Sequence, residues 1–374
     1  MLPLAQNGYS VDQVKAALHA VHGNRRLHFR FAQLTKDDQF IRDITNLVQV
    51  GQSSISMNNT ADQIKRSAQL NVKDDGGINW PQDRIQVFAR LYLPNGYVEW
   101  PQGIFLLSSP TTKYQGLNRY RAVQAYDAMQ QLTDWGFSAR YVVNQGANYV
   151  DTVKSILQGA GITKINIDQT GKTLPTWLDW PPDTSRLEVG NTLLKLINYE
   201  ALHVDENGYF TSHPYQTPQV RAEEYVYATD GQSVIFGGSN GATSTEDYFS
   251  VPNTWIGVVS EPNGLYLTYT YTNDNPNSPT STVSRGRAVT KYISVSATDL
   301  DSLQGIVEQQ ASKDTMVHQV SFSTAVMPIH SYDDVYHFTH NPLYIDGKFE
   351  EISWTMPLQA GGMMQHVAQE VIAI

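Results

Sequence analysis

The alternation of hydrophobic and polar residues predicts short strands over most of the first 130 residues. Residues 27–34 and 84–93 alternate in this way, which is typical of strands with one buried face. Pro94, Asn95 and Gly96 follow the second run, and Asn-Gly favours a hairpin turn because both central positions take positive φ. Further short strands are expected at residues 54–57, 68–72, 97–100, 104–107 and 120–125. Strands this closely spaced indicate a small barrel or sandwich.

Helical periodicity precedes and follows this region. A helix is expected over residues 10–22, where Ser10 and Gln13 have the spacing of a capping box and Gly23 follows as a stop signal. A second short helix is expected over residues 127–135. The first helix is therefore predicted to be a docking extension ahead of the first domain.

Residues 137–215 change character and predict a compact α/β domain. Apolar residues recur at helical spacing in residues 149–157 and 187–202, and residues 162–167 have the pattern of a strand. The sequence Asp-Glu-Asn-Gly at 205–208 separates two short apolar pairs, which indicates a hairpin.

Residues 216–374 return to a strand pattern with one helix, expected over 298–310. Residues 273–282 are rich in Asn, Pro, Ser and Thr, and predict a long, mobile loop. The expected strands are 224–228, 233–236, 253–260, 265–271, 319–327, 335–339, 349–356 and 366–374.

Composition and charge exclude several function classes. The 374 residues include 26 Lys and Arg against 36 Asp and Glu, a formal net charge of −10. A general nucleic-acid binder needs a basic face, so this balance argues against one. The chain has no cysteine, which excludes disulfides, thiolate metal sites and a Cys nucleophile. No window approaches the roughly 18 apolar residues of a membrane span, and the first residues lack a secretory signal, so no stable membrane insertion is expected.

Pairs of adjacent carboxylates suggest a glycoside hydrolase, in which two carboxyl groups flank the scissile bond. Neighbouring side chains on a strand point to opposite faces, however, so solvated turns and strand ends are the favoured interpretation. The pairs are Asp74 with Asp75, Glu223 with Glu224, Asp333 with Asp334 and Glu350 with Glu351.

The best metal candidate is a set of imidazole and carboxylate groups between residues 330 and 340, which suits zinc or a similar cation. Its members are His330, Asp333, His337 and His340. His337 and His340 are three residues apart on an expected strand and should diverge. Surface histidines are therefore the favoured interpretation.

Three other sequence patterns give weak support for a functional site. Residues 237–241 are Gly-rich but lack the Lys-Ser/Thr of a phosphate-binding loop, and Ser331 lacks a nucleophile elbow. Trp177, Trp180, Pro181 and Pro182 could form a sugar-stacking platform, although core or interface anchors are the favoured reading. We assign no catalytic, cofactor-binding or metal-binding residues from the sequence, expect no cofactor, and predict that the protein is not an enzyme.

Several segments, taken in their order along the chain, resemble the tail hub proteins of long-tailed bacteriophages of Gram-positive hosts. That family is similar to the baseplate hub of contractile tails and to the N-terminal part of tail-associated lysins. The resemblance covers roughly residues 25–374. The segments are residues 78–87 (INWPQDRIQV), 99–108 (EWPQGIFLLS), 125–127 (AYD), 160–162 (AGI), 197–199 (INY), 205–208 (DENG), 345–349 (IDGKF) and 353–358 (SWTMPL).

The resemblance implies an α+β, mainly β chain with two related, tube-like β-barrel domains and two peripheral domains, one α/β and one β-rich. The first barrel would span 25–136, after a helical extension at 1–24, and the second 216–235 with 315–374. The α/β domain would be 137–215 and the β-rich domain 236–314. Many relatives continue into a peptidase or lysin domain. This chain ends directly after its last expected strands, so any lytic activity is expected from another chain.

The resemblance also implies a homotrimeric ring that joins the sixfold tail tube to a threefold tip in the virion, assembled in the host bacterial cytoplasm. Its partners would be the distal tail protein, the tape-measure protein and the tip, fibre or receptor-binding proteins. Three chains would carry −30 formal charges, which suits a lumen that DNA crosses without specific binding. The alternatives are a cell-wall hydrolase and a carbohydrate-binding receptor module.

Overall fold

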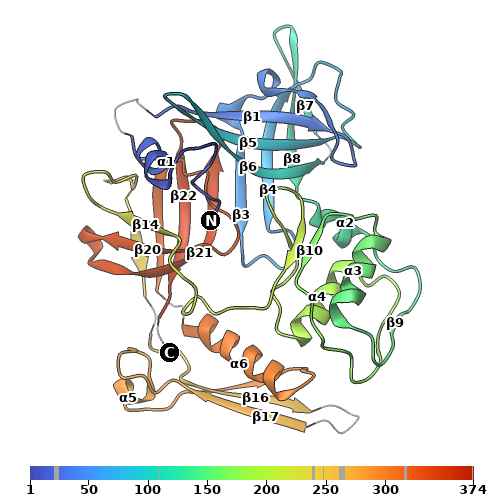
Figure 1. Ribbon diagram of the computed structural model, residues 1–374, viewed down its shortest axis with the longest axis vertical. Helices are drawn as coiled ribbons and strands as arrows, with labels where there is room; N and C mark the ends of the chain where they lie inside the picture. Colours follow the sequence, from blue (N-terminus) through green and yellow to red (C-terminus); the bar gives the residue numbers. More distant parts are fainter. Residues whose placement is uncertain are drawn as a thin grey trace.

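The computed structural model is mainly β, with one large sheet and helices gathered mostly in two other parts of the molecule (Figure 1). None of the helices it describes is long and apolar enough to cross a membrane. It describes residues 1–20, 25–108, 110–237, 241–246, 248–260, 266–315, 318–372 and 374.

One sheet of 14 strands contains both strand-rich portions of the chain. Its main path runs β15-β19-β22-β21-β3-β4-β8-β6-β5-β1-β2, with β14 and β20 joined at β21 and β7 at β8. The first portion contributes β1 (Leu27–Leu34), β2 (Phe40–Asp43), β3 (Ser54–Asn58), β4 (Arg66–Lys73), β5 (Arg84–Leu93), β6 (Gly96–Leu107), β7 (Thr111–Gln115) and β8 (Asn118–Tyr126). The second contributes β14 (Tyr225–Ala228), β15 (Thr243–Thr245), β19 (Gln319–Ala325), β20 (Val335–His340), β21 (Ile345–Pro357) and β22 (Met363–Glu370).

The two portions meet at the antiparallel pair of β21 and β3, where Trp354 lies opposite Met57. β21 is 13 residues long and pairs in turn with β20, β22 and β3. The side chains of Ile55, Met57, Trp354 and Met356 are buried in one hydrophobic core that extends through both portions. The sheet and its core are therefore continuous across the junction.

Helix α1 (Val11–Leu18) packs against this core through Val14 and Leu18. Its expected capping box is confirmed, because Ser10 Oγ accepts from the Gln13 amide and the Gln13 side chain accepts from the Ser10 amide. The helix ends at Leu18, earlier than expected, and the predicted stop at Gly23 lies outside the described residues.

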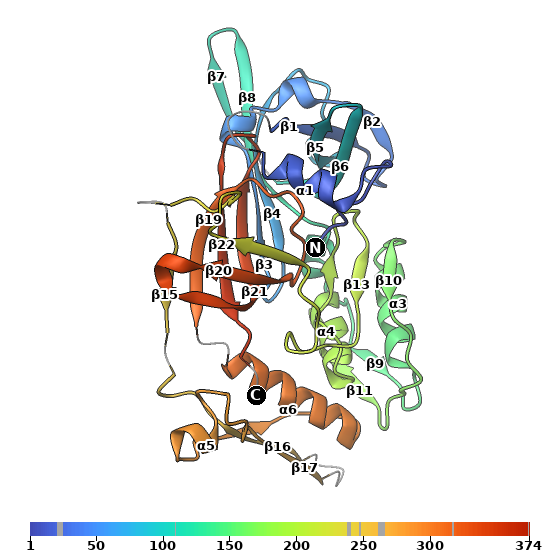
Figure 2. The ribbon, with the colours of Figure 1, turned by 60° about the vertical axis from the view of Figure 1, so that its left-hand side comes forward.

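A second core belongs to residues between 128 and 210. The three helices there lie beside two small sheets, one ordered β10-β13-β12 and the other pairing β9 with β11 (Figure 2). The expected hairpin at 203–210 is confirmed by the β12–β13 pair, whereas the second long helix ends at Leu196, because Asn198 takes a φ of 58°. The elements are α2 (Met129–Asp134), β9 (Tyr141–Val143), α3 (Tyr149–Gly159), β10 (Ile165–Ile167), β11 (Leu178–Trp180), α4 (Arg186–Leu196), β12 (His203–Val204) and β13 (Phe210–Ser212).

A third core lies between helix α6 and a three-stranded sheet, at one end of the molecule (Figures 1 and 2). The helix approaches the sheet closely at Gly257, where a Cβ atom would lie 2.3 Å from Val307 Cγ2. The elements are β16 (Thr254–Ser260), β17 (Tyr266–Thr272), α5 (Thr282–Arg285), β18 (Thr290–Ser294) and α6 (Leu300–Thr315). Three short 3-10 helices, Thr45–Leu47, Val50–Gln52 and Asn341–Leu343, lie in loops of the large sheet.

Residues 273–281 form the expected long loop, which ends at α5. The side chains of Asn273, Ser278 and Thr280 are buried. Asn273 Nδ2 donates to Ser278 Oγ at 2.9 Å, and the neighbouring Asn253 donates to the Thr280 carbonyl at 3.1 Å. These polar side chains form hydrogen bonds with one another in the interior, as buried polar groups require.

Other expectations need smaller corrections. The expected strand at 233–236 is an irregular segment in which Ile235 forms one isolated bridge with Thr324. The expected strands at 97–100 and 104–107 are both parts of β6, and β2, β7, β9, β11, β15 and β18 were not expected at all. The described ladders form a path with free ends at β15 and β2 and do not close it into a barrel.

The junction between β21 and β3 yields a prediction. Trp354 is 2% exposed at the junction, whereas Trp177 is 55% exposed. We expect Trp354→Ala to lower the free energy of unfolding by about 3–5 kcal/mol, because it leaves a large cavity in the shared core. Urea denaturation measures this change. The matched control Trp177→Ala should change stability by less than about 1 kcal/mol, and equal effects of the two variants would contradict the role given to the junction.

Candidate functional site

A cleft of about 560 Å³ lies where four parts of the chain meet. Its walls are the residues that follow β3, the end of α4 with the residues after it, the end of α6, and residues 332–333 with Glu350 of β21. A second hollow of about 400 Å³ adjoins it and shares Glu200, Tyr332 and Asp333. The cleft is therefore bounded by all three hydrophobic cores.

Two of the acidic pairs predicted from the sequence reach this region, and each pair is divided between two environments. Asp333 lines the cleft and takes a φ of 53°, while Asp334 is fully buried beside His330. On β21, Glu350 lines the cleft and Glu351 points into the core, as strand alternation requires. Adjacent carboxylates thus do not act together here.

Three carboxylates of the cleft have raised pKa values. Burial raises the pKa of Asp333 to about 6, that of Glu200 to about 7 and that of Glu350 to about 8. The negative charge of Asp333 raises the pKa of the two glutamates further, and Arg221 lowers all three pKa values only in part.

Tyr332 lines the cleft and contacts both His203 and Lys65. Its ring stacks on His203 with centroids 3.9 Å apart, and Lys65 Nζ lies 5.4 Å from the ring centroid. Lys65 also donates to the carbonyl oxygens of Asn59 and Ala61. Burial lowers the pKa of His203 to about 3, so this imidazole stays neutral. One aromatic ring therefore links three separate segments.

Polar side chains near the cleft form ion pairs and hydrogen bonds between separate segments of the chain. Arg66 of β4 pairs with Glu206 in a buried ion pair, and the Ser331 hydroxyl donates to the same carboxylate at 2.7 Å. Lys172 donates to Ser302 of α6 at 2.7 Å. Because the Ser331 hydroxyl is held by a carboxylate that Arg66 neutralises, it is not activated as a nucleophile.

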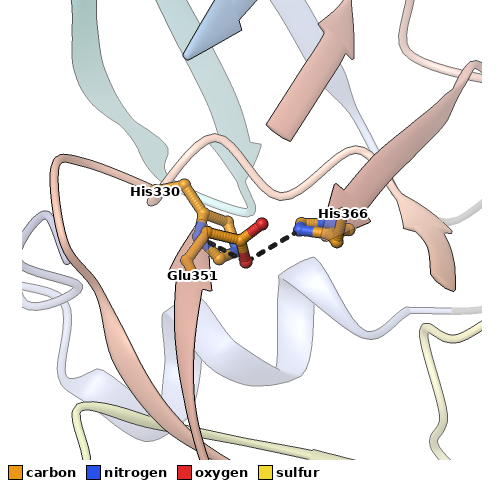
Figure 3. Close-up of side chains that lie close together, drawn as sticks. All are labelled: His330, Glu351 and His366. Atoms are coloured by element: carbon orange, nitrogen blue, oxygen red, sulfur yellow. Dashed lines mark hydrogen bonds and ion pairs between the residues drawn. The ribbon is translucent and has the colours of Figure 1, made fainter. Parts of the chain in front are cut away.

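A separate polar cluster lies in the core beneath β20 and β21, and consists of His330, Glu351 and His366 (Figure 3). Glu351 Oε2 lies 3.2 Å from His366 Nδ1 and 3.9 Å from His330 Nδ1. The Tyr336 hydroxyl donates to the same oxygen at 2.8 Å. All three members are fully or almost fully buried.

The members of the candidate metal-ligand set do not meet, and the favoured interpretation as surface histidines is wrong for His330 and His340, which are buried. His337 lies at the surface, 3.1 Å from Glu223 and 2.8 Å from Asp346, and His340 stacks on Phe338. Only His330 belongs to the buried cluster. Sequence spacing does not find His366, because it lies outside the 330–340 segment and joins His330 only through the pairing of β22 with β21.

The remaining acidic pairs form ion pairs apart from the cleft. Asp74 pairs with Arg119 and Arg121, and Asp75 pairs with Arg42. Glu223 contacts His337, and Glu224 contacts Arg221 and the Met1 amino group.

The two tryptophans proposed as a platform do not form one. Trp180 is buried in the second core near Tyr141, whereas Trp177 is exposed. The Gly-rich segment also stays untested, because residues 238–240 lie outside the described residues.

Sequence reasoning missed Lys65, Glu200, His203 and Tyr332, which line the cleft or the hollow that adjoins it. They come from different parts of the chain and share no motif. Only the neighbouring Asp333 and Glu350 carried a signal, as members of acidic pairs.

Comparison with solved structures identifies a fold like that of phage tail proteins. The tail protein from Neisseria meningitidis MC58 has a TM-score of 0.64 and 11% sequence identity over 92% of this chain and 97% of that protein. The prophage tail protein gp18 from Listeria monocytogenes EGD-e has a TM-score of 0.58 and 12% identity over 91% and 94%. A chain of the Francisella PdpA–VgrG complex has a TM-score of 0.52 and 9% identity over 96% of this chain and 61% of that one.

The family resemblance predicted from the sequence is thus confirmed at the level of the fold. No protein-family model matches the sequence, and no characterised protein matches it by sequence comparison.

The raised pKa of Glu200 predicts a pH-dependent stability. Its pKa is about 7 in the folded chain, against 4.5 for the ordinary group. The folded state therefore holds this proton more tightly, and the resulting stabilisation is present at low pH and is lost as the pH rises from about 4.5 to 7. We expect Glu200→Gln to reduce the drop in Tm between about pH 5 and pH 8 by a few degrees, as measured by thermal unfolding.

The control for this experiment is Glu188→Gln, which changes an exposed residue in the first turn of α4. It should keep the wild-type dependence of Tm on pH. The same dependence in Glu200→Gln would show that Glu200 is ionised at its ordinary pH in the folded chain.

Proposed function

We propose that the protein is a structural hub of a bacteriophage tail tip or baseplate. The observation that supports this most strongly is the likeness of fold to phage tail proteins over more than nine-tenths of the chain. The arrangement of the cleft is consistent with it, because the polar groups there join segments and do not form an activated nucleophile.

We further propose that the two strand-rich portions are the paired tube-like domains, 25–136 and 216–235 with 315–374. The α/β segment 137–215 and the segment 236–314 would be peripheral domains. The separate hydrophobic cores of these two segments support the division. In this arrangement the β21–β3 ladder holds two tube-like units side by side within one chain.

Three such chains would form a ring with six tube-like units, which would match a sixfold tail tube on one side and a threefold tip on the other. A closed ring requires a heterologous interface, in which different surfaces of each copy meet. The distal tail protein, tape-measure protein and tip or fibre proteins would be the neighbours in the virion. The net charge of −10 per chain would limit adhesion of DNA passing through the lumen.

The hairpin of β7 and β8 is the best candidate for a contact within this assembly. It projects from the end of the molecule in both views (Figures 1 and 2), and every residue of β7 is exposed. At its tip, Tyr114 is 75% and Leu117 is 94% exposed. Exposed apolar groups on a projecting hairpin are typical of a surface that becomes buried in an assembly.

The ring predicts a mass in solution. Light scattering of the purified protein, alone and mixed with its distal tail partner, should give three times the mass of one chain in at least one condition. Negative-stain electron micrographs should then show rings. A monomer in both conditions, without rings, would contradict the proposal.

If the hairpin is an interface, changing its exposed apolar residues should prevent assembly without unfolding the protein. The double variant Tyr114→Ser with Leu117→Ser should lose ring formation while its Tm stays within a few degrees of wild type, because neither side chain packs in a core. The matched control is Tyr292→Ser, which changes a residue that is 73% exposed on β18, in the sheet at the opposite end of the molecule. Assembly that survives the double variant would show that the hairpin is not an interface.

A further inference from the structure

We propose that His330, Glu351 and His366 bind one divalent transition-metal ion, for which Zn²⁺ is the best-fitting probe. The three potential ligand atoms all lie within 4.8 Å of one another. Two imidazole nitrogens and a carboxylate oxygen form a donor set that zinc accepts. The inference goes beyond the proposed structural function and does not depend on it.

The distances suit a small cation. Zinc bonds of about 2.0–2.1 Å in a tetrahedral site place ligand atoms roughly 3.3 Å apart. Glu351 Oε2 lies 3.2 Å from His366 Nδ1 and 3.9 Å from His330 Nδ1, so a small movement of His330 completes the geometry. In Figure 3 the two imidazoles approach the carboxylate from different sides, as ligands around one ion must.

The outer nitrogens of both imidazoles are already held by hydroxyl groups. Thr324 Oγ1 lies 2.9 Å from His366 Nε2, and the Tyr227 hydroxyl lies 2.7 Å from His330 Nε2. Metal-binding histidines depend on such partners, which fix the ring orientation and the tautomer. With protons on Nε2 directed to these hydroxyl oxygens, both Nδ1 atoms present lone pairs towards Glu351.

The charge of the cluster also favours a cation. Glu351 is fully buried, and its Oε1 atom has no hydrogen-bond partner in the described structure. Within the parts of the chain that the structure describes, the bases at ion-pair distance from Glu351 are the imidazoles of His330 and His366, and no Lys or Arg is among them. A buried carboxylate without a fixed cation is costly, and a bound metal ion removes that cost.

Asp334 has a place beside the site. Its Oδ2 atom lies 2.8 Å from His330 Nδ1, where it accepts the proton that the metal ion replaces. The metal ion displaces that proton to Nε2, which then donates to the Tyr227 hydroxyl, while Asp334 keeps its ion pair with the Met1 amino group at 2.7 Å. The ion would then join β21, β22 and the segment before β20, which also carries Tyr332 and Asp333 of the cleft.

The test uses the full chain, purified without metal-affinity steps and stripped with a chelator. Added Zn²⁺ should bind at about one equivalent per chain by elemental analysis, and it should raise the Tm. X-ray absorption of the zinc-loaded wild type should show two imidazole ligands among N and O donors. A folded wild type that binds no zinc, or whose zinc has fewer than two imidazole ligands, would overturn the proposal.

Variants locate the ion. Glu351→Gln should weaken zinc binding at least about 100-fold, and Thr324→Val, which keeps the side-chain shape, should weaken it about 10- to 100-fold through His366. His337→Gln is the matched control, since His337 is a surface histidine between two carboxylates. If His337→Gln abolishes binding while Thr324→Val leaves it unchanged, the ion is held at the surface and the buried site is refuted.

Discussion

The antiparallel ladder between β3 and β21 is the constraint on which the rest of the structure depends. It joins strands from opposite ends of the chain into one sheet and places Trp354 opposite Met57 in a shared core. Because a shift of one residue in this register would turn every side chain to the other face, the alternation on β21 fixes two surfaces at once. A β-bulge between Glu351 and Ser353 interrupts this alternation, and before the bulge Glu351 faces the core while Glu350 faces the cleft.

Local features of the fold could be predicted from the sequence. The capping box at Ser10, the return of the chain after Pro94 and the hairpin around residues 205–208 each depend on neighbours within a few positions, and the structure confirms them. The positive φ expected at Asn95 and Gly96 is wrong, since neither residue takes one. The family resemblance was likewise accessible, since it depends on the order of short segments. The loop predicted over residues 273–282 is present up to the start of α5, but composition could not show that some of its polar side chains pair with each other inside the protein.

The candidate site was much less accessible to sequence reasoning. The acidic pairs at 333–334 and 350–351 were recognised, but their division between cleft and core depends on the positive φ of Asp333 and on strand register. Glu200, His203 and Lys65 approach Tyr332 only through tertiary contacts. Histidine spacing was misleading, since His366 is brought to His330 by the pairing of β21 with β22.

Ionisable groups lie in two different environments, the cleft and the core of the large sheet. In the cleft, burial raises the pKa values of Glu200, Asp333 and Glu350 towards neutral pH. In the core, carboxylates and imidazoles form a compact network with tyrosine and threonine hydroxyls. The first arrangement makes the contacts among four segments sensitive to acidity, and the second holds the segment before β20 firmly against the sheet.

The separation of the two paired strands has a consequence for biogenesis. Ser56 on β3 contacts Thr355 on β21 across 299 residues of sequence, so a ribosome completes most of the polypeptide before the second strand exists. Until then, one side of β3 is an unpaired edge, which is a template for aggregation. A stalled or shortened translation product that lacks β21 would leave the same edge of β3 exposed to aggregation.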